Sequence, residues 1–308
     1  MARLTVESIA ASDAFRIEAN FHEPFARTSF DAAAVVNSGA GIPKTLYDSF
    51  ASWLADNGVP TVTYDYRGVG GSRGKSIRGL DVSIQDWGSK DCAAILNTVK
   101  SRYAGAKLHV VGHSIGGIVT GFVTNPPEID RMVLVSPHTG FWRDYARPSR
   151  RRMYWQWHVL MPGITRIVGY FPGRLLGLPE DLPYGVAMEW ASSRDGARDR
   201  RLRFAGAAAR AGRQRLQRAG AEGFIRFDAS ILAIRPSDDP FATPEGLDRV
   251  ASLYSRCTFR DLRIDVEPGE RALGHFGFFR SASRTRLWPI VLEWLKSGQC
   301  PQAVAHRR

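Results

Sequence analysis

Short apolar runs alternate with amphipathic segments along the first half of the chain. Residues 14–21 alternate apolar and polar positions, as a half-buried strand does, and residues 32–36 form a compact apolar run. The predicted strands are residues 14–21, 32–36, 59–64, 108–111 and 132–135. The predicted helices between them are residues 46–57, 82–103 and 115–123. Short apolar strands separated by helices indicate an α/β fold with a mostly parallel sheet flanked by helices.

This alternation stops after the fifth strand and returns near residue 229. Residues 138–228 contain no strand-like run but are rich in aromatic side chains, among them Trp142, Trp155, Trp157 and Trp190. Beyond them the sequence predicts strands at 231–234 and 257–264 and helices at 244–253 and 286–295. We therefore expect a core formed by residues 1–137 and 229–308, with residues 138–228 inserted as a helical cap.

A candidate nucleophile stands directly after the strand at residues 108–111. Gly112-His113-Ser114-Ile115-Gly116 has the G-x-S-x-G spacing of a nucleophile elbow, in the strand–turn–helix setting that such an elbow requires. The turn is strained, and both glycines must lack a side chain so that the backbones can approach. Ser114 is the predicted nucleophile. Its neighbour His113 is not expected to be the base, because adjacent side chains point in different directions.

The base that activates the serine is expected downstream, after an acid. In this type of site the chain order is serine, then aspartate or glutamate, then histidine. The histidines downstream of Ser114 are His138, His158, His275 and His306. His138 and His158 precede the acid candidates, and His306 lies in the terminal tail. His275 lies in a glycine-flanked loop between the last predicted strand and helix, so it is the predicted base.

The acid is expected at the end of the strand at 231–234. Asp238 and Asp239 both follow that strand. Asp239 is favoured because it opens Asp-Pro-Phe-Ala-Thr-Pro, which is similar to the loops after the acid in related enzymes, and Asp238 remains the alternative. Asp261 and Asp265 lie in or just after the next predicted strand and are weaker candidates.

Two backbone N–H groups are expected to form the oxyanion hole. One is that of Ile115, at the start of the helix after the nucleophile, and the other comes from the loop after an early strand. Ser38-Gly39-Ala40-Gly41 occupies that loop. Ala40 is the favoured donor and Gly41 the alternative.

Composition narrows the class of protein. The chain has 308 residues and 44% hydrophobic side chains, as globular proteins do, and no apolar run long enough to span a membrane. Glu7 and Asp13 stand where a signal peptide would need an apolar stretch, so a cytoplasmic location is expected. The three cysteines have no metal-site or disulfide spacing, and neither metal nor cofactor is expected.

The formal net charge of +12 would favour anionic partners. Arginines cluster at Arg147 with residues 150–152, and again from Arg194 to Arg218. Aromatic residues are interleaved with the first cluster, as in proteins that bind single strands, but no nucleic-acid-binding motif accompanies them. Solvated arginine-rich helices are the favoured interpretation, and no nucleic-acid partner is expected.

Three motifs together resemble the bacterial α/β hydrolases of the serine aminopeptidase-like group. They are Tyr64-Asp65-Tyr66-Arg67-Gly68-Val69-Gly70-Gly71-Ser72, the elbow around Ser114, and Gly274-His275-Phe276-Gly277-Phe278-Phe279-Arg280. The segment from Gly169 to Arg174 is similar to the cap of that subfamily. The resemblance implies the α/β-hydrolase fold with an eight-stranded, mostly parallel sheet, a cap over the site, and the triad roles of Ser114, Asp239 and His275. Ser38 departs from the histidine that many relatives carry before the oxyanion glycine.

The expected function is therefore that of a serine hydrolase acting on a small-molecule acyl substrate. Cleavage of a carboxylic ester through an acyl-enzyme is favoured over cleavage of an amide or thioester. Two alternatives remain open: acyl transfer by the same triad, and a member of the fold that binds a ligand without turnover. The sequence does not indicate an oligomeric state.

Overall fold

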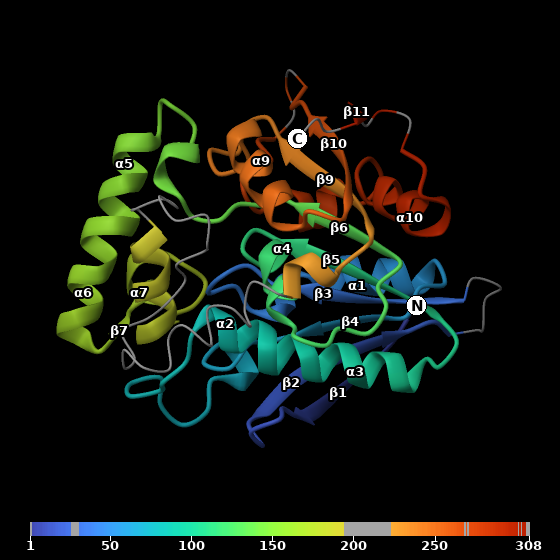
Figure 1. Cartoon of the computed structure of the whole chain (residues 1–308), viewed down its shortest axis with the longest axis horizontal. Coiled ribbons are helices and arrows are strands. Elements are labelled where there is room, and N and C mark those ends of the chain that lie inside the picture. Colours follow the sequence, from blue (N-terminus) through green and yellow to red (C-terminus); the bar gives the residue numbers. More distant parts are fainter. Residues whose placement is uncertain are drawn as a thin grey trace.

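The computed structural model describes residues 2–25, 31–193, 223–267, 269, 271–300, 302, 304 and 305. Its centre is a nine-stranded sheet in the order β1-β2-β4-β3-β5-β6-β9-β10-β11 (Figure 1). The strands are β1 (Arg3–Ala10), β2 (Arg16–Glu23), β3 (Ala32–Asn37), β4 (Thr61–Tyr64), β5 (Lys107–His113), β6 (Arg131–Val135), β9 (Ser230–Pro236), β10 (Thr258–Ile264) and β11 (Val304–Ala305).

The six strands from β4 to β10 in this order are parallel, and antiparallel strands lie at both edges. The mostly parallel sheet predicted from the alternating pattern is confirmed. The sheet has one strand more than the resemblance implied, because β11 pairs with β10 at the last edge. β1 was not predicted, and it pairs with β2 over its whole length, from Arg3 with Glu23 to Ala10 with Arg16.

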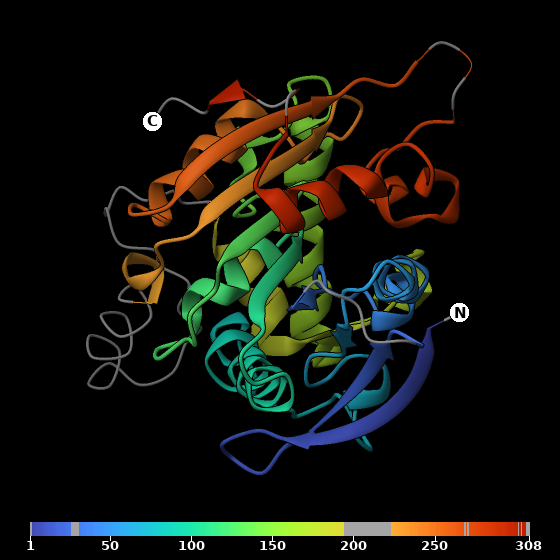
Figure 2. The ribbon, with the colours of Figure 1, turned by 90° about the vertical axis from the view of Figure 1, so that its right-hand side faces the viewer.

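Helices cover both faces of the sheet. Apolar side chains of α1 and α10, including Phe50 and Val291, pack on one face, and those of α3, α4 and α9, including Leu96 and Val250, pack on the other (Figure 2). The helices are α1 (Asp48–Asp56), α2 (Ile84–Asp86), α3 (Ala93–Arg102), α4 (Gly116–Val119), α5 (Arg150–Trp155), α6 (Met161–Val168), α7 (Tyr184–Ser192), α9 (Pro244–Leu253) and α10 (Trp288–Ser297). The predicted helix at 82–103 is divided, since a π-helical segment, Trp87–Cys92, separates α2 from α3.

The chain between β6 and β9 builds a separate group of elements at one end of the sheet (Figure 1). Its described residues contain α5, α6 and α7, together with a small antiparallel pair, β7 (Tyr170–Phe171) and β8 (Leu182–Pro183). These strands are two residues long, too short to leave a periodic pattern in the sequence. The arginine cluster from Arg194 to Arg218 lies outside the described residues.

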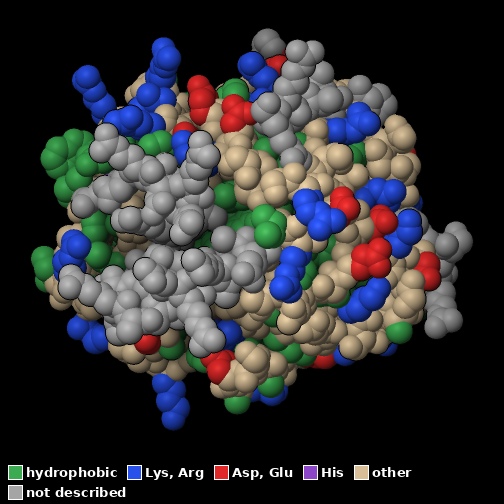
Figure 3. All heavy atoms as spheres, in the orientation of Figure 1, with side chains coloured by type: hydrophobic (Ala, Val, Ile, Leu, Met, Phe, Trp, Pro, Cys, Tyr) green, Lys and Arg blue, Asp and Glu red, His purple; other side chains and the backbone are tan. Residues whose placement is uncertain are grey.

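The surface carries its basic side chains in several places. On the face in Figure 3, Lys and Arg side chains are spread over many elements, with acidic side chains among them. Exposed apolar side chains include Trp155, Leu160 and Ile167, from the α5–α6 segment. Among the described helices, none has both the length and the apolar character needed to cross a bilayer.

Candidate active site

The turn after β5 holds Ser114 in strained backbone. Its φ is +57°, and only Ala14 and Ser136 share a positive φ among the described non-glycine residues. A Cβ on Gly112 would lie 2.7 Å from the carbonyl oxygen of Gly116, and one on Gly116 would lie 2.3 Å from that of Asn37. Both positions therefore require glycine. The backbone N–H of Ser114 donates to Val135 of the neighbouring strand at 2.9 Å, which fixes the turn against β6.

The loops after β9 and β10 bring Asp239 and His275 together. Oδ2 of Asp239 lies 2.8 Å from Nδ1 of His275, and its Oδ1 accepts the backbone N–H of Phe241 at 2.9 Å. Burial by itself would raise the pKa of Asp239, but the charge of His275 and its hydrogen bond outweigh burial and lower the pKa to about 2. The carboxylate is thus ionised near neutral pH and directs Nδ1–H of the imidazole towards itself, which leaves Nε2 as the basic nitrogen.

The adjacent Asp238 makes a different contact. Both of its carboxylate oxygens accept the backbone N–H of Gly274 at 3.0 Å. Asp238 thus holds the backbone of the His275 loop, whereas Asp239 contacts the ring. The weaker candidates lie in ion pairs elsewhere, Asp261 with Arg235 and Asp265 with Arg263.

His113 links three loops by hydrogen bonds. The carbonyl oxygen of His275 can only accept, so Nε2–H of His113 donates to it at 2.8 Å. Nδ1 of His113 then accepts the hydroxyl of Tyr47 at 2.7 Å, and that oxygen accepts the N–H of Gly39 at 3.0 Å. Burial lowers the pKa of His113 well below its ordinary value, so the ring is neutral. Both ring nitrogens are occupied, and neither is left for Ser114.

The loop after β3 lies against the nucleophile. A Cβ on Gly39 would lie 3.3 Å from Cβ of Ser114, so the backbone here passes close to the serine. Ala40 follows in this loop, and Ile115 begins the turn into α4. Among the described residues, the backbone N–H groups of Ala40 and Ile115 donate to no backbone carbonyl outside the helices and strands. Backbone N–H groups in these two loops are the kind of donor that suits a developing oxyanion.

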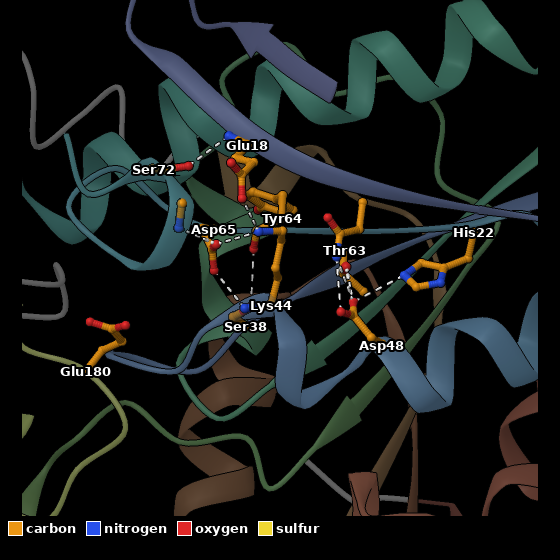
Figure 4. Close-up of polar contacts among 12 residues, drawn as sticks. Glu18, His22, Ser38, Lys44, Asp48, Thr63, Tyr64, Asp65, Ser72 and Glu180 are labelled. Carbon is orange, nitrogen blue, oxygen red and sulfur yellow. Dashed lines mark hydrogen bonds and ion pairs between the residues drawn. The ribbon is translucent and has the colours of Figure 1, made fainter. Parts of the chain in front are cut away.

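Asp65, at the end of β4, anchors the far end of this loop. It accepts the backbone N–H of Lys44 at 2.7 Å, the Lys44 ammonium at 2.9 Å and the N–H of Gly71 at 2.9 Å (Figure 4). The ammonium also donates to Glu18 at 2.6 Å. Burial would lower the pKa of Lys44, but the two carboxylates outweigh it and raise the pKa, so the side chain is charged. The Asp65 motif noted in the sequence thus fixes the loop that carries Ala40.

Lys44→Met is expected to lower the free energy of unfolding by about 3 kcal/mol, because it leaves the buried Asp65 carboxylate without its cation. Urea unfolding measures this loss. Glu18→Gln is the matched control: the Glu18 side chain is 39% exposed, so its ion pair contributes about 0 to 1 kcal/mol. Equal losses of unfolding free energy in the two variants would contradict a dominant role for the ion pair between Lys44 and Asp65.

The hydroxyl of Ser114 has a partner that sequence reasoning set aside. Its Oγ lies 2.9 Å from Nε2 of His138, and no hydrogen bond joins Ser114 to His275 among the described contacts. The sequence does not predict His138 as the base, because it precedes the acid candidates and falls within residues 138–228. The sequence does contain a signal for this contact. His138 closely follows β6, and β6 lies beside β5, whose end carries Ser114.

Other reactive groups lie apart from this cluster. Cys92, Cys257 and Cys300 are buried thiols. Among the described residues, no three His, Cys, Asp or Glu side chains are grouped so as to hold a metal ion.

Comparison with known proteins gives a family and a fold. A family model described as serine aminopeptidase, S33, matches residues 28–216, more than half of the chain. A monoglyceride lipase homolog of monkeypox virus is 29% identical over 110 residues, which are 34% of this chain and 38% of the viral protein.

Solved structures agree with the fold. The structure of DcsB with its substrate analogue has a TM-score of 0.62 at 15% identity, with 96% of this chain and 100% of DcsB covered. The Pyrococcus furiosus esterase Pf2001 has a TM-score of 0.57 at 14% identity, with 96% and 91% covered. At these identities the likeness extends to the fold alone. The elbow at Ser114, the parallel sheet and the family match lead to one conclusion: this chain is an α/β hydrolase and belongs to the serine aminopeptidase S33 family.

Proposed function

We propose that the chain is a serine hydrolase that cleaves a carboxylic ester through an acyl-enzyme. The observation that carries the proposal is the arrangement around the elbow: a serine on a strained turn, and a nearby histidine held by a buried carboxylate at 2.8 Å. A neutral serine hydroxyl is a weak nucleophile and needs such a base. The name of the viral relative supports an ester over an amide or thioester.

The proposed reaction divides its steps among five residues. The Ser114 hydroxyl donates to Nε2 of His275, which takes its proton as Oγ attacks the acyl carbon. Asp239 orients the imidazole and stabilises its charged form. The N–H groups of Ala40 and Ile115 bind the oxyanion. His275 then protonates the leaving alcohol, and water releases the acid from Ser114 by the reverse sequence.

Residues 138–228 are proposed as a cap that binds the acyl chain. A cavity of about 300 Å³ lies at α6 and α7, lined by His158, Val159, Pro162, Arg166, Met188, Ala191 and Ser192. Trp190 directly precedes two of these residues, and its ring lies 5.8 Å from that of His138 and 5.4 Å from that of Trp157. Trp190 therefore connects the side chain of His138, beside Ser114, with the segment that lines the cavity, and we take it as the residue that limits the length of the acyl chain.

A series of p-nitrophenyl esters of increasing chain length tests this function. Each methylene buried should add about 0.8 kcal/mol, or roughly fourfold in kcat/KM, until the pocket is full. Trp190→Ala should move the optimum to longer chains, while the rate of Ser114 labelling by a small fluorophosphonate stays within about tenfold. No hydrolysis of any ester in the series would reject the proposed activity.

Trp155→Ala is the matched control, because the Trp155 side chain is 59% exposed. Its chain-length optimum should stay at the wild-type position. If Trp190→Ala gives a folded protein that the fluorophosphonate no longer labels, residues 138–228 help to build the catalytic site and are not a separate cap.

A further inference from the structure

The hydrogen bond between Ser114 and His138 joins two strained turns at neighbouring strand ends. His138 follows β6 after Ser136, whose φ is +52°. The N–H of Ser136 donates to Ile234 of β9 at 2.8 Å, so this turn is held between β6 and β9 just as the Ser114 turn is held against β6. Positive φ at a serine costs free energy and persists where surrounding structure enforces it, often at functional sites. The fold thus holds Nε2 of His138 at 2.9 Å from the nucleophile.

The direction of this hydrogen bond follows from the other ring nitrogen. The backbone N–H of Gly140 donates to Nδ1 of His138 at 3.0 Å, so Nδ1 carries a lone pair and no proton. Burial, and then the positive charge of His275, lower the pKa of His138 to about 3, which keeps the ring neutral. The single proton of a neutral ring whose Nδ1 accepts must reside on Nε2. His138 therefore donates to Ser114 Oγ and cannot take the serine proton.

Aromatic neighbours fix the ring in this orientation. The ring of Phe241 is stacked on that of His138, with centroids 4.8 Å apart and planes 22° apart. Phe241 also lies 4.7 Å from the ring of His275, and Trp190 borders His138 on another side. The His138 side chain is buried, so its N–H acts in a water-poor site where a fixed donor is most effective.

We propose that His138 is a catalytic hydrogen-bond donor that assists the departure of Ser114 Oγ when the acyl-enzyme is hydrolysed. The inference rests on the acyl-enzyme mechanism proposed above. Water attacks the acyl carbon and gives a proton to Nε2 of His275. The bond from the acyl carbon to Oγ then breaks, Oγ keeps the electron pair and receives that proton from His275. His138 keeps its own proton and stabilises the negative charge that develops on Oγ.

The hydrogen bond from His138 should accelerate deacylation more than acylation. An interaction changes the rate of a step only if it is stronger in the transition state than in the ground state of that step. In the free enzyme Oγ is already hydrogen-bonded to His138, so the serine gains little from this contact as it attacks. In the acyl-enzyme Oγ is an ester oxygen, a weak acceptor, and the hydrogen bond strengthens only as the charge returns. Loss of the donor should therefore slow deacylation more than acylation.

The test compares His138→Leu, which removes the donor, with His138→Gln, whose amide can donate to Ser114 and accept from Gly140. Rapid mixing with p-nitrophenyl butyrate gives the acylation rate from the burst and the deacylation rate from the steady state. In His138→Leu, deacylation should fall by about 10- to 100-fold and acylation by a clearly smaller factor, and intact-mass spectra should show accumulated acyl-enzyme. His138→Gln should deacylate within about tenfold of the wild type.

Several results would overturn this role. His138→Leu with normal deacylation, or with both rates reduced equally, would remove it. Loss of fluorophosphonate labelling in both variants, each shown to be folded by circular dichroism, would mean that His138 serves the attack itself. If both variants are inactive while His275→Gln turns over, His138 is the base. Wild-type protein that forms no acyl-enzyme would instead reject the proposed function, independently of His138.

Discussion

Ser114→Ala is expected to lower kcat by about 10⁴- to 10⁶-fold and to abolish labelling by a fluorophosphonate. The hydroxyl is the group that forms the covalent bond, and no other side chain can take its place on the turn after β5. The loss should appear in kcat with little change in the midpoint of unfolding. The substitution removes one side-chain oxygen and leaves the backbone of the turn, with its hydrogen bond to Val135 and its close approaches at Gly112 and Gly116, as it is.

Ser101→Ala provides the matched control for this prediction. Ser101 is an exposed serine near the end of α3, so the same chemical change there should leave turnover and labelling at wild-type levels. If the Ser114 variant retains more than a tenth of the wild-type esterase activity, the nucleophile is a different residue and the proposed mechanism is wrong.

Asp239→Asn is expected to reduce kcat by about 10⁴-fold, the effect of losing the carboxylate that orients a catalytic imidazole. An asparagine amide beside Nδ1 no longer favours the tautomer with the proton on Nδ1, and it does not stabilise the charged ring. The carboxylate has a lowered pKa because its attraction to His275 outweighs the cost of burial, so the lost interaction is a strong one. Steady-state kinetics on the preferred p-nitrophenyl ester measure the effect.

Asp238→Asn makes the comparison with an adjacent residue of the same type. Its side chain accepts the N–H of Gly274, and the oxygen of an asparagine can still accept that proton, so kcat should stay within about tenfold of the wild type. The reverse order of effects would assign the orienting role to Asp238 while leaving Ser114 and His275 in place.

Local patterns in the sequence were sufficient for the fold class and for the elbow. Alternating apolar runs and helical spacing depend on neighbouring residues, and the parallel strands β3, β5, β6 and β9 lie close to their predicted positions. The elbow was predictable for the same reason, because steric exclusion at Gly112 and Gly116 acts over a few residues. The edge strand β1 was missed because its stability comes from pairing with β2.

Contacts between distant segments decided the details of the candidate site. The order serine, acid, histidine singled out His275, and the motif after Asp239 favoured it over Asp238. The loop conformation decides which of these adjacent carboxylates faces the ring. The ion pair of Lys44 with Asp65 joins residues 21 positions apart, and the hydrogen bond between Ser114 and His138 joins residues 24 positions apart. Sequence by itself determined the parallel sheet and the turn that carries the nucleophile, because these follow from local periodicity and sterics. Only the tertiary structure decided which side chains meet at that turn, because the hydrogen bonds of Ser114 and His275 depend on how separate strand ends come together at one edge of the sheet.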